Sequence, residues 1–283
     1  MTVPSEFWQA LVYCSESARG SPTGVVFPGK DLTSDQYQAT ASSLGYPDAV
    51  FLTPSPDNSE WSARSFSPAQ ELSLCTQALI AGFRVLQRRN AISSPTHILF
   101  RTPSGLIEVS ELIPERKDVA WLVGPYRVLD RGISKSPLAA IEALAPAEEI
   151  VIDTGRTRLF RELPDAERLT ALALHPTQVI DYCAAEKIHG ICLFARTGER
   201  EIRMRVFTTS LDGGEDIATG GAVMGLLPYL QRKYAGVLEG CWTIHQGFGA
   251  RHQRGTLFTS RHSEPGMAVV GGRHRFVAKG TLL

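Results

Sequence analysis

Short apolar stretches bounded by glycine and proline recur along the chain and predict a fold rich in strands. A tail of residues 268–283 is also expected to be strand-like, with a turn at Gly271 and Gly272. Residues 97–101 and 106–112 are expected to form a hairpin around Pro103, Ser104 and Gly105. The remaining strands are expected at residues 10–14, 23–27, 49–53, 191–195 and 202–208.

Helical signals are fewer. Thr33 is a predicted N-cap, Gln36 completes a capping box with it, and Gly45 is a predicted C-cap. Residues 166–172 and 176–185 are also expected to be helical. No clear pattern covers residues 121–149, where a junction between two parts of the chain is expected.

An internal repeat is the most informative pattern. The segment ELSLCTQALIAGFRVLQRR (residues 71–89) aligns without a gap with EDIATGGAVMGLLPYLQRK (residues 215–233). Each copy has a turn of small residues, an apolar helix and a basic end, and each follows a predicted strand that ends near Phe66 or Phe207. A helix that is apolar on nearly every face must be surrounded by protein. The repeat therefore predicts two lobes, each with a sheet around one helix, and the alternative is chance similarity between two buried helices.

Composition excludes several classes of function. The 283 residues carry a formal net charge of zero, so nothing favours nucleic acid. No apolar run is long enough to span a membrane, and no signal peptide is evident, so we expect a cytoplasmic protein. The five cysteines contain no C-x-x-C pair and the histidines form no ligand motif, which supports neither disulfides nor a metal site.

The turns before the two repeated helices are the candidate sites. Thr219, Gly220 and Gly221 enter the second helix, whose free backbone N–H groups suit a carboxylate. The alternative is ordinary turn chemistry. The first copy has Cys75, Thr76 and Gln77 at the equivalent place.

Cys75 has two interpretations, whereas the sequence alone gives Asp48 only one. A helix N-terminus lowers a thiol pKa, so Cys75 is a candidate base, but its counterpart is Thr219 and a structural cysteine is the alternative. Asp48 follows Pro47 between a predicted helix and a predicted strand, where an aspartate is usually a turn residue.

The chain resembles the PhzF-like (phenazine biosynthesis) isomerases, which have the diaminopimelate epimerase-like fold. Five motifs carry the resemblance in order: GSPTGVVF (20–27), residues 32–51, FSPAQELSLCTQ (66–77), EDIATGGA (215–222) and VAKGTLL (277–283). The family has G-N-P-x-A-V, a helix followed by L-S-E-x-x-F, F-T-P-x-x-E-L-P-F-A-G-H, E-D-P-A-T-G-S-A and a closing G-x-G strand at these places.

The resemblance implies an α+β fold of two pseudo-symmetric lobes, each an antiparallel barrel-like sheet around a central helix, with the site between them. The expected domains are residues 1–118 and 119–283, with the last strand possible in either lobe. The implied activity is cofactor-independent proton transfer that moves a double bond in a small carboxylate substrate. By position, the family's catalytic glutamate falls on Asp48, its histidine on Gln77, its aspartate on Asp216 and its serine on Gly221.

Three of these four positions differ from the family. Asp48 has a shorter carboxylate arm, Gln77 cannot titrate, and Gly221 lacks a hydroxyl, so the substrate is expected to differ from that of the phenazine enzyme. Such altered sites resemble isomerases of pyrroline-type dienes in lincomycin-like and pyrrolobenzodiazepine pathways. The other hypotheses are an amino-acid epimerase, against which Thr219 argues because a second thiol is absent, and a binding protein that lost its chemistry. A homodimer is expected.

Overall fold

The computed structural model describes residues 4–56, 59–92, 96–113, 116, 118–131, 148–234, 240–248 and 253–282. The chain divides into two compact units. Unit 1 comprises Met1–Val123 and Gly271–Leu283, and unit 2 comprises Gly124–Val270. The chain passes from unit 1 to unit 2 within strand β8 (Val119–Pro125) and returns within strand β17 (Met267–Leu282).

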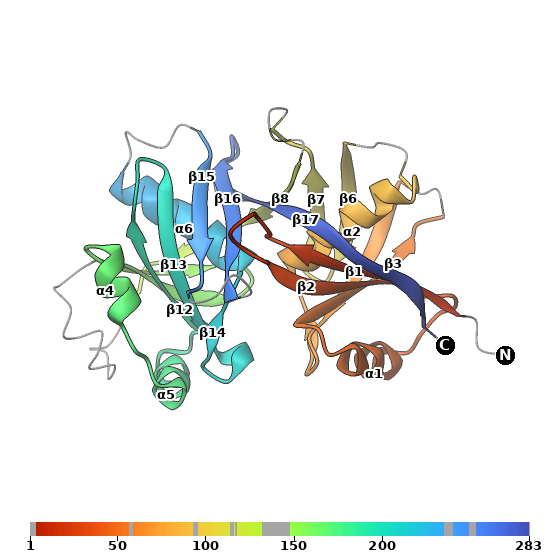
Figure 1. The fold of residues 1–283 in the computed structure, drawn as a ribbon, viewed down its shortest axis with the longest axis horizontal. Helices are drawn as coiled ribbons and strands as arrows, with labels where there is room; N and C mark the ends of the chain where they lie inside the picture. Colours follow the sequence, from red (N-terminus) through yellow and green to blue (C-terminus); the bar gives the residue numbers. More distant parts are fainter. Residues whose placement is uncertain are drawn as a thin grey trace. The chain divides into compact units, whose positions relative to one another are not determined.

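Unit 1 is a ring of strands (Figure 1). Strand β17 pairs with β1, the neighbours then follow in the order β2, β3, β4, β6, β7 and β8, and β8 pairs with β17 to close the ring. The elements are β1 (Ser5–Val12), β2 (Ser21–Phe27), α1 (Ser34–Leu44), β3 (Asp48–Pro54), β4 (Glu60–Phe66), β5 (Glu71–Leu72), α2 (Thr76–Arg88), β6 (His97–Thr102) and β7 (Gly105–Ser110).

Helix α2 is the core of unit 1. Every residue from Thr76 to Leu86 is buried, and the helix packs against β1, β2, β3, β6 and β7. An ordinary surface helix buries only one stripe. The burial of all faces therefore matches the prediction of a helix surrounded by protein.

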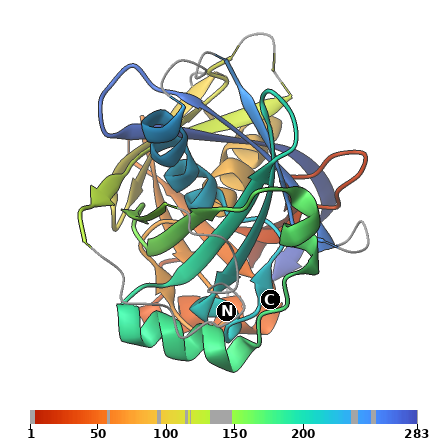
Figure 2. The same ribbon diagram turned by 90° about the vertical axis from the view of Figure 1, so that its left-hand side faces the viewer.

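Unit 2 repeats this order of elements. Strands β9, β10, β11, β12, β13, β15 and β16 are successive neighbours, and β14 pairs with β13. Figure 2 shows the strands of this unit around α6, with α4 and α5 outside them. The elements are β9 (Arg127–Leu129), β10 (Glu149–Asp153), β11 (Thr157–Glu162), α4 (Ala166–Ala171), α5 (Pro176–Glu186), β12 (Gly190–Arg196), β13 (Glu201–Thr208), β14 (Glu215–Asp216), α6 (Gly220–Lys233), β15 (Trp242–Gln246) and β16 (Gly255–Arg261).

The two units share the pattern of strand directions. An antiparallel pair comes first in each unit, as β1 with β2 and as β10 with β11. A parallel pair across a helical crossover follows it, as β2 with β3 and as β11 with β12. An antiparallel pair follows, as β3 with β4 and as β12 with β13. The central helix then leads to a second parallel pair, as β4 with β6 and as β13 with β15. The internal repeat is therefore a repeat of topology, and chance similarity of two helices is excluded.

The predicted helices and strands are present, although β1 begins and ends before the expected residues 10–14 and β7 ends two residues before the expected residue 112. Thr33 and Gln36 form the capping box of α1, and Gly45 is its left-handed C-cap. The predicted turn at Gly271 and Gly272 is wrong, because β17 runs through both residues as one strand. A Cβ at Gly271 would lie 2.5 Å from the Trp121 ring, and one at Gly272 would lie 2.3 Å from the ring of Tyr13. These glycines make room for aromatic rings and do not turn the chain.

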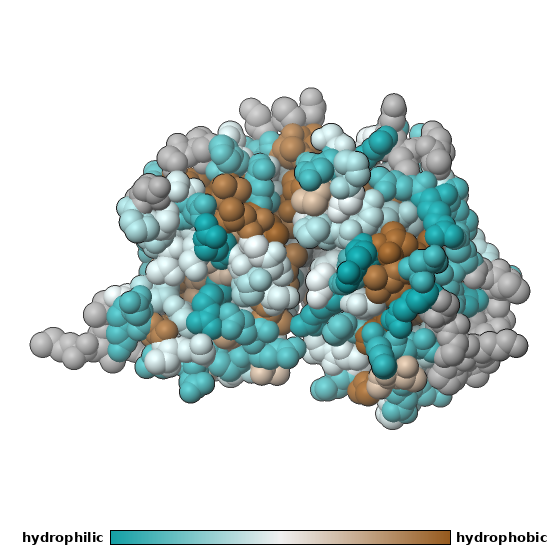
Figure 3. Space-filling model, turned by 180° about the vertical axis from the view of Figure 1, so that it is seen from behind, coloured by the Kyte–Doolittle hydropathy of each residue, from teal (hydrophilic) through white to brown (hydrophobic). Residues whose placement is uncertain are grey.

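The surface is mixed in character. Figure 3 shows hydrophobic patches among hydrophilic side chains on one face. No helix in the described part of the chain has the length and apolar character needed to cross a membrane. Residues 132–147, which belong to the stretch without a clear sequence pattern, lie outside the described residues.

Candidate functional site

The N-terminus of α2 is fixed by two buried side-chain contacts. The Thr76 hydroxyl lies 2.9 Å from the hydroxyl of Tyr13, and Gln77 Nε2 donates to Thr23 Oγ1 at 2.5 Å. Tyr13 is fully buried and has φ of +64°, a conformation that is costly for an aromatic residue. The fold therefore holds a strained tyrosine against the first helical residue, and the Gln77 side chain against strand β2.

Asp48 is the first residue of β3 and is 5% exposed. Its register partner in the parallel pair is Thr23, the residue that accepts from Gln77. Thr23 thus links two predicted site residues, because it is the register partner of Asp48 and accepts a hydrogen bond from Gln77. Asp48 is a buried strand residue, so its interpretation as a solvated turn residue is wrong.

Cys75 is the N-cap residue of α2 and is partly exposed. The Cys75 carbonyl accepts the first helical hydrogen bond, from the backbone N–H of Leu79, at 3.1 Å. Its counterpart Thr219 is the N-cap residue of α6. The two residues therefore occupy equivalent positions, as the sequence alignment predicts.

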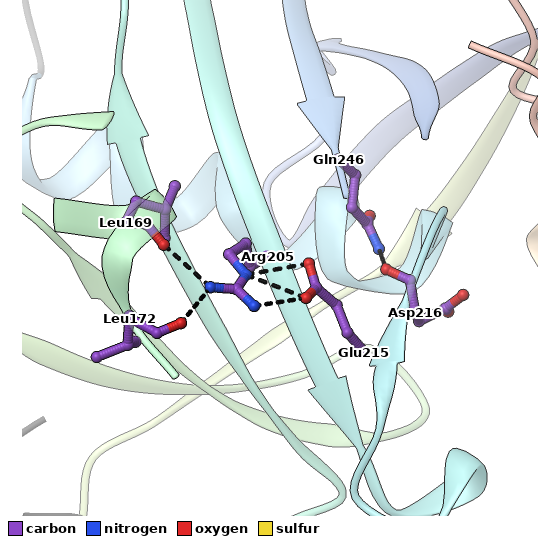
Figure 4. A network of polar contacts seen from close by, with 6 residues as sticks. All are labelled: Leu169, Leu172, Arg205, Glu215, Asp216 and Gln246. Carbon is purple, nitrogen blue, oxygen red and sulfur yellow. Dashed lines mark hydrogen bonds and ion pairs between the residues drawn. The ribbon is translucent and has the colours of Figure 1, made fainter. Parts of the chain in front are cut away.

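A hydrogen-bond network holds the turn before α6, and Figure 4 shows one of its bonds, between Gln246 and Asp216. Asp216 Oδ2 accepts from Thr219 Oγ1 at 2.6 Å, and its Oδ1 accepts from the backbone N–H of Ala218 at 3.3 Å. The fully buried Gln246 donates to the Asp216 carbonyl at 2.7 Å and to Thr219 Oγ1 at 2.9 Å, and accepts from the Thr219 N–H at 2.9 Å. Both carboxylate oxygens of Asp216 are thus committed to the turn that begins the helix.

The protonation of Asp216 is set by opposing effects. Desolvation raises the pKa of Asp216 above its usual range, although the hydrogen bonds from Thr219 and Ala218 and the charge of Arg158 act in the opposite direction. The Asp216 side chain keeps part of its surface exposed. The network suits a carboxylate that orders backbone N–H groups.

Gly220 and Gly221 form the first residues of α6. A Cβ at Gly221 would lie 3.3 Å from Arg158 Nη1 and 3.3 Å from Thr154 Oγ1. Thr154 Oγ1 donates to the Gly221 carbonyl at 2.9 Å. Sequence reasoning missed Arg158, a strand residue of β11 that is only 5% exposed. An arginine in a strand is ordinarily expected at the surface, and nothing in the local sequence pattern indicates that Arg158 is buried.

The predicted site residues fall into two groups. Asp48, Cys75, Thr76 and Gln77 belong to unit 1, and Asp216, Thr219, Gly220 and Gly221 belong to unit 2. Within each unit they gather at the N-terminus of the central helix. The described residues contain no group of three or more His, Cys, Asp or Glu side chains placed to hold a metal ion.

Solved structures define the class of fold. A phenazine biosynthesis protein of the PhzF family from Bacillus anthracis has a TM-score of 0.79 at 15% identity, with 99% of both chains covered. A hydroxyproline epimerase from Agrobacterium vitis, solved with bound trans-4-hydroxy-L-proline, has a TM-score of 0.65 at 12% identity and covers 99% of this chain and 92% of that one. The fold is thus the one shared by PhzF-type proteins and these epimerases, which confirms the predicted fold class.

The family follows from the sequence itself. The PhzC-PhzF family, described as phenazine biosynthesis-like protein, matches residues 11–276, and the chain belongs to it. An uncharacterized isomerase of Halalkalibacterium halodurans is 25% identical over 82% of this chain and 83% of that protein. The uncharacterized isomerase YfhB of Bacillus subtilis is 30% identical over 34% of this chain, a match that spans 33% of YfhB. Family and relatives together indicate an enzyme of the isomerase or epimerase class.

Proposed function

We propose that the chain is a cofactor-independent isomerase that moves a proton, and with it a double bond, in a small carboxylate substrate. Its membership in the PhzC-PhzF family over residues 11–276 supports the reaction class. The observation that carries the assignment is Asp48, a carboxylate 5% exposed at the start of β3, where the resemblance puts the family's catalytic glutamate.

Asp48 is the proposed proton carrier. Gln77 does not titrate and Gly221 has no side chain, so neither supplies a proton. Asp216 directs both oxygens into the turn before α6, through Thr219 and Ala218. A carboxylate used in this way orders the helix N-terminus, which leaves Asp48 to remove a proton from one carbon and return it to another.

The amino-acid epimerase remains the weaker candidate. Two-base racemisation needs a second acid–base group opposite the first. The Thr219 hydroxyl is held between Asp216 and Gln246, where it orders the turn. This arrangement favours a single carrier and a double-bond shift over inversion at one carbon.

The experiment measures proton exchange and does not require the natural substrate. The protein is incubated in D₂O with a panel of pyrroline and dihydroaromatic carboxylates, and NMR follows both the loss of C–H signals and the shift of the double bond. Asp48→Asn should lower the rate of the reaction about 10²- to 10⁴-fold, the usual contribution of general acid–base catalysis. Asp48→Glu, which restores the family's side chain, should retain part of the rate.

Controls separate chemistry from folding. Asp48→Asn should keep the circular dichroism spectrum and the binding of the active panel member. Asp181→Asn changes an exposed aspartate on helix α5 of unit 2 and should leave the rate unchanged. A rate for Asp48→Asn within about threefold of the parent enzyme would contradict the role of Asp48, because general catalysis is worth far more.

The finer expectations remain proposals. We propose a substrate of the pyrroline-diene type, a place in secondary-metabolite (antibiotic) biosynthesis, a homodimeric state and a cytoplasmic location. The altered positions Gln77 and Gly221 support a substrate unlike that of the phenazine enzyme. Light scattering during size-exclusion chromatography tests the dimer, and retention of exchange activity after chelation and dialysis tests independence from cofactors.

A further inference from the structure

Arg158 is a buried cation without a carboxylate partner among the described residues. Its side chain is 5% exposed, and its Nε has no hydrogen-bond partner. Its hydrogen bonds run from Nη1 to Thr154 Oγ1 at 3.3 Å and to the Arg156 carbonyl at 3.1 Å. Buried charges in proteins are normally paired, so this guanidinium requires an explanation.

The neighbouring Arg161 shows the ordinary solution. It lies on the same strand, is 7% exposed, and donates from Nη1 to Glu149 Oε1 at 2.6 Å. Asp216 and Asp153 act on Arg158 through their charges. The oxygens of Asp216, however, accept from Thr219 and Ala218, and those of Asp153 accept from the Gly155 N–H and pair with Arg127. Arg158 therefore differs from Arg161 in lacking a hydrogen-bonded anion.

The guanidinium of Arg158 lies beside the N-terminal turn of α6. Nη1 and Nη2 lie 3.3 and 3.8 Å from the place where a Cβ of Gly221 would stand. The first backbone N–H groups of an α-helix have no acceptor within the helix and carry partial positive charge. The guanidinium and the first turn of α6 thus place two sources of positive potential side by side.

The equivalent place in unit 1 is built in the opposite way. There the helix supplies the long side chain, Gln77, and the strand supplies the short one, Thr23. In unit 2 the helix residue is Gly221 and the strand residue is Arg158. The same space is filled by a neutral amide in one unit and by a cation in the other, which makes only the second suited to an anion.

We propose that Arg158 and the N-terminal turn of α6 together form a binding site for a carboxylate, and that Arg158 is the residue that selects a carboxylate over a neutral ligand. The site's assignment to substrate rests on the proposed function. Burial lowers the pKa of Arg158, but an arginine still remains charged at neutral pH. Its charge is therefore available at every pH at which the enzyme works.

The test compares a carboxylate with its neutral amide. Pyrrole-2-carboxylate and pyrrole-2-carboxamide are the probes, because the aromatic ring cannot isomerise, and calorimetry measures their binding to the full chain. The parent protein should bind the carboxylate at least about tenfold more tightly than the amide, since hydrogen bonds to charged groups are the stronger ones. Arg158→Met should remove that preference, and Arg158→Lys should keep part of it.

Arg161→Met is the matched control. It removes a buried arginine from the same strand and leaves Glu149 without this partner, so it should cost at least as much stability but leave the preference intact. Gly221→Ala is a second variant that keeps the charge but crowds it, and it should weaken carboxylate binding more than amide binding.

Two results would overturn the proposal: no carboxylate binding in the millimolar range, or an unchanged preference in Arg158→Met. Both results are measured by binding and do not depend on turnover. The binding test can therefore be interpreted even if Asp48→Asn contradicts the proposed isomerase activity, and a negative binding result does not contradict the role of Asp48.

Discussion

Arg64 and Arg205 make the same ion pair in the two units and provide a matched comparison. Each arginine lies on a long strand, β4 or β13, and pairs at 2.7 Å with the glutamate of the short strand that follows, Glu71 of β5 or Glu215 of β14. The arginine side chain is 30% exposed in the first pair and 12% exposed in the second. We predict that Arg205→Met destabilises the protein far more than Arg64→Met.

The magnitude follows from the contacts that are lost. Arg205 also donates from Nη1 to the carbonyls of Leu169 and Leu172, at 3.1 and 2.5 Å, at the C-terminal end of α4 (Figure 4). Its removal leaves a mostly buried carboxylate and two helix-end carbonyls without this donor, which is expected to cost about 3 kcal/mol. The more exposed Arg64 pair is expected to contribute about 1 kcal/mol or less.

The assay is urea unfolding of both methionine variants, which keep most of the apolar stem of arginine. The difference of about 2 kcal/mol corresponds to a shift of the midpoint on the order of 1 M urea. Circular dichroism follows unfolding of the whole chain in both variants. Fluorescence of Trp242 reports in addition on unit 2, and that of Trp8, Trp61 and Trp121 on unit 1 when Trp242 is replaced by phenylalanine.

The double variant Arg205→Met with Glu215→Gln serves as the control, because it leaves no uncompensated charge and should recover part of the loss. Equal losses in Arg64→Met and Arg205→Met would refute the reasoning from burial.

Three further predictions concern packing, pH and the thiol. Gly225→Ala should cost about 1–3 kcal/mol in urea unfolding, because its Cβ would lie 2.5 Å from the Phe160 ring, whereas Gly82→Ala, whose Cβ would meet the flexible end of Leu52 at 3.0 Å, should cost clearly less. Burial lowers the pKa of His274 to about 4, with Arg84 acting in the same direction; the neutral form is favoured in the fold, so its stabilisation is full above about pH 6.5 and is lost as the pH falls toward 4. His274→Gln should flatten the unfolding free energy over that window, and parallel curves would contradict the assignment. Cys75→Ser should keep most of the exchange rate, and a loss of about a thousandfold with the fold intact would restore the thiol as a base.

The sequence predicts what is local. The caps of α1 follow from Thr33, Gln36 and Gly45, and the burial of both central helices follows from apolar residues on every face. The position of Asp48 beside Thr23 follows from a parallel strand pair, which no local pattern announces. Asp48 is identified as a site residue only by the resemblance to the PhzF-like family. The local sequence pattern around it predicts an ordinary turn residue.

What stays hidden in the sequence is the pairing of distant segments. Gly271 and Gly272 resemble a turn until the rings of Trp121 and Tyr13 are seen against them. Arg158 resembles a surface residue until its strand is found inside unit 2. In both cases the residue type is explained by a contact with a residue from a distant part of the chain. The periodicity of the sequence carries no information about such contacts.

Strand β17 has a consequence for how the protein is made. Its residues 274–282 pair with β1, with Ser5 opposite Leu282, so the ring of unit 1 cannot close while the ribosome is still adding residues 271–282. While all of unit 2 is synthesised, the sheet of strands β1 to β8 stays open. During this time β1 and β8 have unpaired edges on the side that β17 will occupy. Pairings of such long range slow folding and leave open sheet edges exposed to association. A circular permutant that joins residues 271–282 directly before β1 by a short linker would give the nascent chain its closing strand first, and should fold faster and aggregate less during expression.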